Sequence, residues 1–181
     1  FLDRGAFRVI AVTTDERYSR MVENGGVFAR LFQKLELDEM ELPLIRRIVD
    51  EALRLYPPAA FLSRTAQGPD ELCGREIRAG DTVILPIYAL HRHHALWQAP
   101  DSFDPGRFAD PRAVPRFHYL PFGDGPRICI GASFALQEAV IILATLLARF
   151  RFAPVPGREP KPVMILTLRP EGGVWLQVDR A

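Results

Sequence analysis

The stretch from residue 122 to residue 131, FGDGPRICIG, holds three glycines, one arginine and one cysteine in ten positions. Glycines allow positive φ angles and close backbone approach, so such a loop can aim several N–H groups at one point. A segment with helical apolar spacing follows at 132–150, and the N-terminus of a helix adds a partial positive charge. Together with Arg127, these features favour a thiolate at Cys129 over a thiol. The chain is therefore constrained to fold around one immobile, anionic sulfur.

Such a sulfur suits several roles. A catalytic nucleophile needs a nearby base, and His118 is the local candidate, although no known nucleophile signature fits. A zinc site needs further cysteines or a histidine pair at ligand spacing. Haem iron takes a single thiolate, whose donor strength is tuned by hydrogen bonds to the sulfur. A buried structural cysteine needs none of the surrounding turn chemistry, so the loop argues against that role.

Composition bounds the class of protein. The chain has 181 residues, enough for one domain with its own core, and 23 Lys+Arg against 22 Asp+Glu give a net charge of +1, so we expect no nucleic-acid partner. The longest apolar run, 139–150, is too short to cross a bilayer. No leader segment opens the sequence and both cysteines fit a reducing compartment, so we expect a cytoplasmic protein. Because the chain begins with Phe1, we also expect a fragment of a longer protein.

Apolar spacing and turn residues predict a mainly α protein with small β-sheets, an α+β fold class. The predicted helices are 13–23, 27–37, 44–56 (ending at Pro57-Pro58) and 132–150, and the region from 91 to 126 is predicted to be irregular. The predicted strands are 7–12, 60–66, two strands within 71–90 on either side of residues 79–81, and a hairpin over 163–178 that turns at 170–173.

The loop at 122–131 resembles the haem-binding signature of cytochromes P450. That signature specifies six positions, which this chain fills with Phe122, Gly123, Gly125, Arg127, Cys129 and Gly131. The resemblance covers residues 42–181 and implies the C-terminal, haem-binding part of the P450 fold, while residues 1–41 stay unassigned. It implies haem b as the cofactor and Cys129 as the axial ligand of its iron. Gly123 and Gly131 would shape the loop, and Phe122 would shield the sulfur beside the proximal haem face.

A second motif of the same family lies upstream. Glu51 and Arg54 form E-x-x-R on one face of the predicted helix and can pair. In P450s an arginine from a later segment completes a buried triad, and here FDPGRF at 103–108 supplies Arg107, although Gly106 stands where the family usually has glutamate. A buried triad is better at specifying one geometry than at stabilising the fold. We therefore expect it to tie the helix to the region that carries Cys129.

The resemblance also implies residues that bind the haem propionates. Arg64 and Arg127 are the expected partners, because guanidinium groups bind carboxylates bidentately. His91 is a weaker candidate for the same role. For the run HRHH at 91–94 we expect no metal, and for Cys73, placed in a strand beside Gly74, a packed thiol.

A pocket for substrate is expected near the strand predicted at 60–66. Its expected lining residues, which can equally belong to the core, are Ala60, Phe61 and Leu62, with the turn at 170–173 reaching the same pocket.

By resemblance, the chain is a haem–thiolate monooxygenase that inserts one atom of O2 into a small apolar substrate, such as a fatty acid or a terpenoid. Electrons would come from a ferredoxin or a flavin reductase, which we expect to dock at Arg112 and Arg116. The acid–threonine pair of the family is not found, because TTDE at 13–16 lacks the glycine kink and has the wrong order. The alternative is a truncated, non-catalytic member that acts as a haem-binding or interaction domain.

Overall fold

The computed structural model describes residues 18–20, 41–110 and 112–181. The chain divides into two compact units, residues 1–38 and 39–181. In the first unit residues 18–20 are helical, within the helix predicted at 13–23. The strand predicted at 7–12, the TTDE run at 13–16 and the helix predicted at 27–37 lie outside the described residues.

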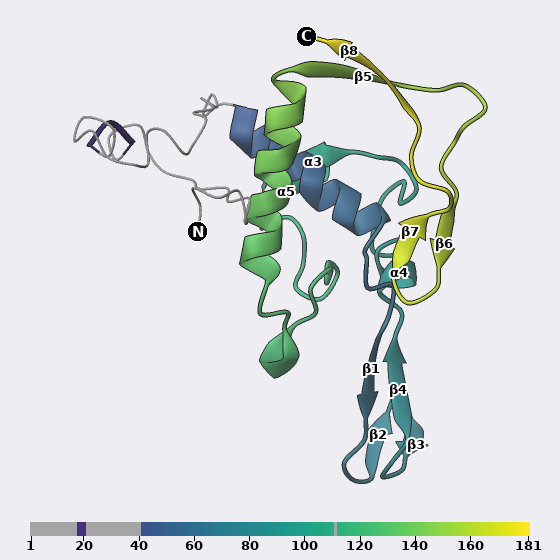
Figure 1. Ribbon diagram of the computed structural model, residues 1–181. Helices are drawn as coiled ribbons and strands as arrows, with labels where there is room; N and C mark the ends of the chain where they lie inside the picture. Colours follow the sequence, from purple (N-terminus) through teal and green to yellow (C-terminus); the bar gives the residue numbers. More distant parts are fainter. Residues whose placement is uncertain (1–17, 21–40, 111) are drawn as a thin grey trace, which may run out of the picture. The chain divides into compact units, whose positions relative to one another are not determined.

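Two long helices, α3 (Glu41–Leu55) and α5 (Ala132–Leu147), pack against each other in this unit (Figure 1). Pro43 lies in the first turn of α3, where its missing N–H costs nothing, and Pro57 follows the helix end. The buried side chains of α3 include Ile45 and Val49, and α5 buries the small Ala144. The helices predicted at 44–56 and 132–150 are thus confirmed, with the first beginning earlier and the second ending earlier.

Residues 62–85 form one extended arm (Figure 1). Strand β1 (Leu62–Thr65) pairs antiparallel with β4 (Thr82–Leu85), which confirms the strand predicted at 60–66, and β2 (Asp70–Leu72) pairs with β3 (Arg75–Ile77). The pair β2–β3 lies at the far end of the pair β1–β4 (Figure 1). The two strands predicted on either side of 79–81 are confirmed as β3 and β4, but the prediction for 71–90 missed β2 and a short helix, α4 (Ile87–Leu90).

The missed turn between β2 and β3 also corrects the prediction for Cys73. Cys73 and Gly74 have φ angles of 51° and 76°, the paired positive values of a tight hairpin turn. Cys73 is therefore neither in a strand nor packed: its side chain is exposed at the turn and its thiol is free.

The C-terminal residues form two further antiparallel pairs. Strand β5 (Phe150–Pro154) pairs with β8 (Leu176–Arg180), and β6 (Pro162–Met164) pairs with β7 (Leu168–Pro170). The hairpin predicted over 163–178 is wrong in its pairing, because β7 and β8 belong to different sheets. Gly172 and Gly173, with φ angles of 68° and 89°, redirect the chain between them.

The segment from 91 to 126, which was predicted to be irregular, is mostly irregular and is held by capped turns and ring contacts. Two short 3-10 helices, η2 (Pro105–Phe108) and η3 (Gly125–Arg127), are capped by the carboxylates of Asp104 and Asp124. The rings of His91, Tyr119, Phe108 and Trp97 follow one another at centroid distances of 5.4, 4.9 and 6.3 Å. In the part of the chain that the structure describes, no helix is long and apolar enough to span a membrane.

Candidate functional site

The loop around Cys129 is closed by its own backbone. The amide of Cys129 donates to the carbonyl of Phe122 at 2.9 Å, and the amide of Ile128 donates to the carbonyl of Gly125 at 3.0 Å. Helix α5 begins three residues later at Ala132, whose amide donates to the carbonyl of Cys129 at 3.2 Å. These bonds fix the backbone of the cysteine at the N-terminal end of α5.

Backbone conformation and limited space both favour glycine in this loop. Gly123 and Gly125 both have a φ of 74°, in the left-handed region that side chains disfavour. A Cβ on Gly123 would also lie 3.3 Å from Cδ1 of Leu62, so the loop packs against the start of β1. A Cβ on Gly131 would lie 3.9 Å from the sulfur of Cys129.

The surroundings of the sulfur fit a large apolar ligand. Cys129 is exposed and free, and its neighbours Ile128 and Ile130 are 53% and 104% exposed. The two isoleucines therefore leave an exposed apolar surface on both sides of the free sulfur. No cluster of three or more His, Cys, Asp or Glu side chains lies among the described residues, so that part of the chain offers no multidentate zinc site. Cys129 therefore stands as a single sulfur donor in the described part of the chain.

Glu51, Arg54 and Arg107 are brought together as one buried cluster. Arg54 binds the carboxylate of Glu51 bidentately, from Nε at 2.7 Å and from Nη2 at 2.8 Å, and neither side chain is exposed. Nε of Arg107 lies 3.4 Å from Oε1 of Glu51, and its Nη2 donates to the carbonyl of Ala99 at 2.9 Å. The same carboxylate accepts the amide of Asp104 at 2.8 Å.

Arg54 also binds the irregular segment directly. Its Nη1 donates to the carbonyls of His91 and Pro100, both at 2.7 Å, and its Nη2 donates to the carbonyl of Ser102 at 3.1 Å. The guanidinium lies 5.1 Å from the ring centroid of Trp97. One arginine of α3 thus orders three backbone positions between 91 and 102, a role that the sequence did not reveal.

His91 has the surroundings of a structural residue. It is fully buried, its Nε2 accepts the amide of Leu120 at 2.8 Å, and its Nδ1 lies 3.2 Å from the carbonyl of Arg54. Because Nε2 accepts, the proton is on Nδ1, which donates. Burial lowers the pKa of His91 to about 4. Both ring nitrogens are occupied by backbone groups, so neither is available to a propionate in this arrangement.

Tyr119 joins the segment before the loop to α3 as well. Its hydroxyl lies 3.0 Å from the carbonyl of Asp50 and 3.1 Å from Oδ1 of the same residue. Burial, and then the charge of Asp50, raise the pKa of the Tyr119 hydroxyl above its ordinary range. Tyr119 and Leu120, which precede the cysteine loop, are therefore held by Asp50 of α3 and by His91, respectively.

The other arginines that the sequence predicted for the site, Arg64, Arg127, Arg112 and Arg116, are exposed. Arg64 is on β1, where its Nη1 donates to the carbonyl of Ser63 at 2.8 Å, and Arg127 is the last residue of η3. Arg112 contacts Asp110 at 3.2 Å and Arg116 contacts Asp124 at 3.2 Å. The amide of Gly125, and then Arg116, lower the pKa of Asp124. Arg116 is thus paired with the carboxylate that caps η3.

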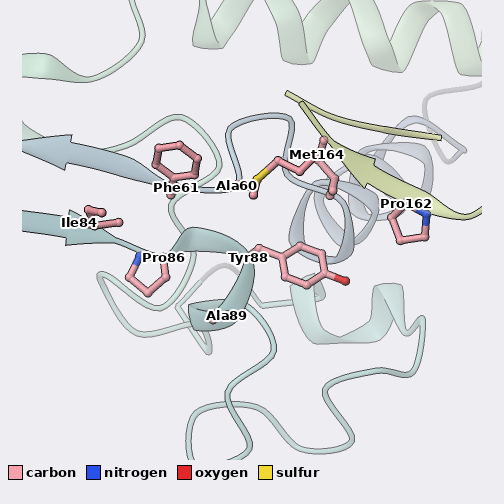
Figure 2. A pocket seen from close by; sticks show the side chains of 9 residues that line it. Ala60, Phe61, Ile84, Pro86, Tyr88, Ala89, Pro162 and Met164 are labelled. Carbon is pink, nitrogen blue, oxygen red and sulfur yellow. The ribbon is translucent and has the colours of Figure 1, made fainter. Parts of the chain in front are cut away.

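An apolar cavity of about 540 Å³ lies between the base of the β1–β4 hairpin and the β6–β7 hairpin (Figure 2). Ala60 and Phe61 line it, whereas Leu62 is not among its lining residues and lies instead at Gly123 of the cysteine loop. The turn at 170–173 does not line it either. The lining residues that the sequence did not reveal are Ile84, Pro86, Tyr88, Ala89, Pro162, Met164 and Leu168.

Backbone bonds hold the two sides of this cavity. The amide of Tyr88 donates to the carbonyl of Ala60, and the amide of Leu168 donates to the carbonyl of Pro58, both at 2.9 Å. Tyr88 is the one lining residue with a polar side chain, and the guanidinium of Arg92 lies 4.1 Å from its ring centroid. The cavity is therefore shaped for an apolar ligand, and the adjacent Leu62 connects it to the cysteine loop.

Comparison with known proteins gives one consistent result. A family model described as Cytochrome P450 matches residues 32–177. Cyclooctatin synthase of Streptomyces melanosporofaciens is 44% identical over 137 residues, 74% of this chain and 30% of that protein. Cytochrome P450 4F12 of Homo sapiens is 38% identical over 154 residues, 81% of this chain and 29% of that protein. Cytokinin hydroxylase of Arabidopsis thaliana is 38% identical over 136 residues, 75% of this chain and 27% of that protein. The chain thus spans about 30% of the length of the curated relatives it matches.

Proposed function

The chain belongs to the cytochrome P450 family, as the signature at 122–131 predicted, and we propose that it supplies the haem-binding part of a haem–thiolate monooxygenase. The observation that carries the proposal is the accessible Cys129 at the N-terminal end of α5, between two exposed isoleucines. The partial positive charge at the N-terminus of α5 would stabilise a thiolate at this position. A planar apolar macrocycle bound to the sulfur would cover Ile128 and Ile130.

Each residue of the site has a proposed task toward haem b. Cys129 would hold the haem iron through its sulfur, and the glycines at 123 and 131 would let the backbone approach the haem closely. Phe122, whose carbonyl accepts the amide of Cys129, shields the sulfur from water. The exposed guanidinium groups of Arg64 and Arg127 bind the propionates. Haem held by these residues would supply the O2 chemistry with electrons from a redox partner, and thiolate donation would favour cleavage of the O–O bond.

The other residues act by position. The cluster of Glu51, Arg54 and Arg107 fixes the segment that leads to the loop, and His91 fixes the amide of Leu120 just before it. His91 is therefore assigned to positioning and not to propionate binding.

The substrate is proposed to be a small apolar molecule that enters the cavity lined by Ala60 and Phe61. The lining supports this, because almost all of its side chains are apolar. Two of the relatives are named as hydroxylases, Taurochenodeoxycholic 6 alpha-hydroxylase and Cytokinin hydroxylase. Hydroxylation with one atom of O2 requires two electrons, which a ferredoxin or a flavin reductase would deliver. Arg112 and Arg116 are proposed to dock that partner through charge steering.

A second candidate function rests on the exposed apolar side chains of α5, such as Phe134 at 70%. In that case the chain is a non-catalytic member of the family whose apolar surface binds protein instead of haem. Haem retention separates the two candidates.

The test is the carbon monoxide difference spectrum of the chain purified with haem and then reduced. The proposal predicts stoichiometric haem and a strongly red-shifted, thiolate-type band. Cys129→Ala removes the band, whereas Cys73→Ala, which replaces the other cysteine at an exposed turn, retains it. A chain that retains no haem supports the second candidate, and a thiolate-type band that survives Cys129→Ala contradicts the ligand assignment.

A further inference from the structure

A small cavity between residues 96 and 118 collects unsatisfied polar groups. In the described part of the chain, the buried side-chain nitrogens and oxygens without a hydrogen-bond partner are Trp97 Nε1, Arg107 Nε and His118 Nδ1. All three side chains line one cavity of about 200 Å³, whose other walls are Leu96, Gln98, Ala113, Val114 and Pro115. Buried polar groups are normally paired with protein, water or a ligand, so three orphans around one space indicate a bound water molecule or a ligand.

The chemistry of these groups specifies what the ligand offers. The N–H groups of Trp97 and Arg107 donate only, and the ring nitrogen of His118 donates in one of its two tautomers. A water molecule accepting from these groups would still have two hydrogens to place, and Gln98 is the one other polar side chain in the wall that could accept one. A ligand that only accepts hydrogen bonds satisfies the donors without that cost, and small anions are such ligands.

The charge around the cavity points in the same direction. Glu51 is shared by two arginines, so this cluster of three side chains carries one positive charge in excess. Arg54 takes both carboxylate oxygens in hydrogen bonds, whereas Nε of Arg107 lies 3.4 Å from Oε1 without forming one. Trp97, which is only 7% exposed, lies against the guanidinium of Arg54. A buried excess charge is favourable only with a counter-charge close by.

We propose that this cavity, lined by Trp97, Arg107 and His118, is a binding site for a small monovalent inorganic anion such as chloride. The anion neutralises the buried cluster and joins Arg107 of η2 to the segment that contains His118. It does not depend on haem, so the site and the proposed monooxygenase function stand or fall separately.

The two tryptophans of the chain make the site directly observable. Trp97 lines the cavity, whereas Trp175 is 58% exposed and lies outside it. The indole N–H resonances of the isotope-labelled full chain are recorded by NMR while sodium bromide replaces sodium gluconate at constant ionic strength, and Trp175→Phe assigns the two signals. The proposal predicts a saturable shift of the Trp97 signal and no saturable shift of the Trp175 signal. A Trp97 signal that stays fixed, or moves linearly with bromide, shows that water alone occupies the cavity and overturns the proposal.

Two variants locate the anion, and a third is the control. His118→Leu removes one donor and is expected to weaken bromide binding about tenfold, the loss of one hydrogen bond to a charged group. Val114→Phe fills the cavity while leaving all three donors, and is expected to abolish the saturable shift. His94→Leu replaces an exposed histidine outside the cavity and leaves the affinity unchanged. A saturable shift that persists unchanged in both cavity variants overturns the assignment of the site.

Discussion

Replacing Arg54 tests how the conformation of the cysteine region is specified. In Arg54→Leu, the bidentate bonds to Glu51 and the bonds to the carbonyls of His91, Pro100 and Ser102 are lost together. Breaking a buried ion pair by removing one partner costs about 3–5 kcal/mol. Each buried carbonyl left without its donor adds about 1–3 kcal/mol, although these costs overlap.

Glu51 keeps two weaker partners in this variant, which limits the loss. Arg107 lies 3.4 Å away and the amide of Asp104 donates at 2.8 Å. We therefore expect the free energy of unfolding to fall by about 4 kcal/mol, close to the whole stability of a small domain. Arg54→Lys keeps the charge but cannot bind both carboxylate oxygens of Glu51 bidentately. We expect its free energy of unfolding to fall by about 2 kcal/mol.

The measurement is urea denaturation of the full chain, followed by far-ultraviolet circular dichroism and by tryptophan fluorescence. The matched control is Arg47→Leu on the same helix, whose Nε donates to the carbonyl of Pro43 on the exposed side. We expect a change within about 0.5 kcal/mol for the control. A loss below about 1 kcal/mol in Arg54→Leu, or an equal loss in the control, would refute the reasoning.

Two further predictions concern His91 and the loop glycines. The folded-state pKa of His91 is lowered to about 4 from 6.5, so the unfolded chain binds a proton first as the pH falls. The free energy of unfolding is therefore highest above pH 6.5 and falls by about 3 kcal/mol between pH 6.5 and about 4. His91→Asn, whose amide can accept from Leu120 and donate to Arg54, should flatten this decline in denaturation measured at several pH values. An unchanged slope would show that another group causes the decline. Gly123→Ala and Gly125→Ala share a φ of 74°, but only the first adds a contact at 3.3 Å, to Leu62. Each substitution should lower the free energy of unfolding by about 1 kcal/mol because of its backbone conformation. Gly123→Ala alone should lose further thermal stability, and equal losses in the two variants would show that Leu62 moves aside freely.

The parts of the fold that depend on local sequence could be predicted. The helices at 44–56 and 132–150 follow from their apolar spacing, with a proline pair ending the first, and both are confirmed. The turn between β2 and β3 was missed because cysteine is not a typical turn residue, although Gly74 was a signal for it.

Pairing partners and side-chain surroundings could not be predicted. The strands near 163–178 exist, but a local pattern does not say that β7 pairs with β6 and β8 with β5. His91 looked available to a ligand in the sequence, whereas the fold places backbone groups at both of its nitrogens. The cavity draws Met164 and Tyr88 from segments far apart in the chain, which no single motif connects.

The central claim, that the sulfur of Cys129 binds the iron of haem, is tested most directly by resonance Raman spectroscopy of the ferric, haem-loaded chain. The account predicts an iron–sulfur stretching band that shifts when the haem carries a heavier iron isotope and that disappears in Cys129→His, while Cys73→Ala keeps it. Haem bound with no such band in the unmodified chain, or a band that persists in Cys129→His, would contradict the account.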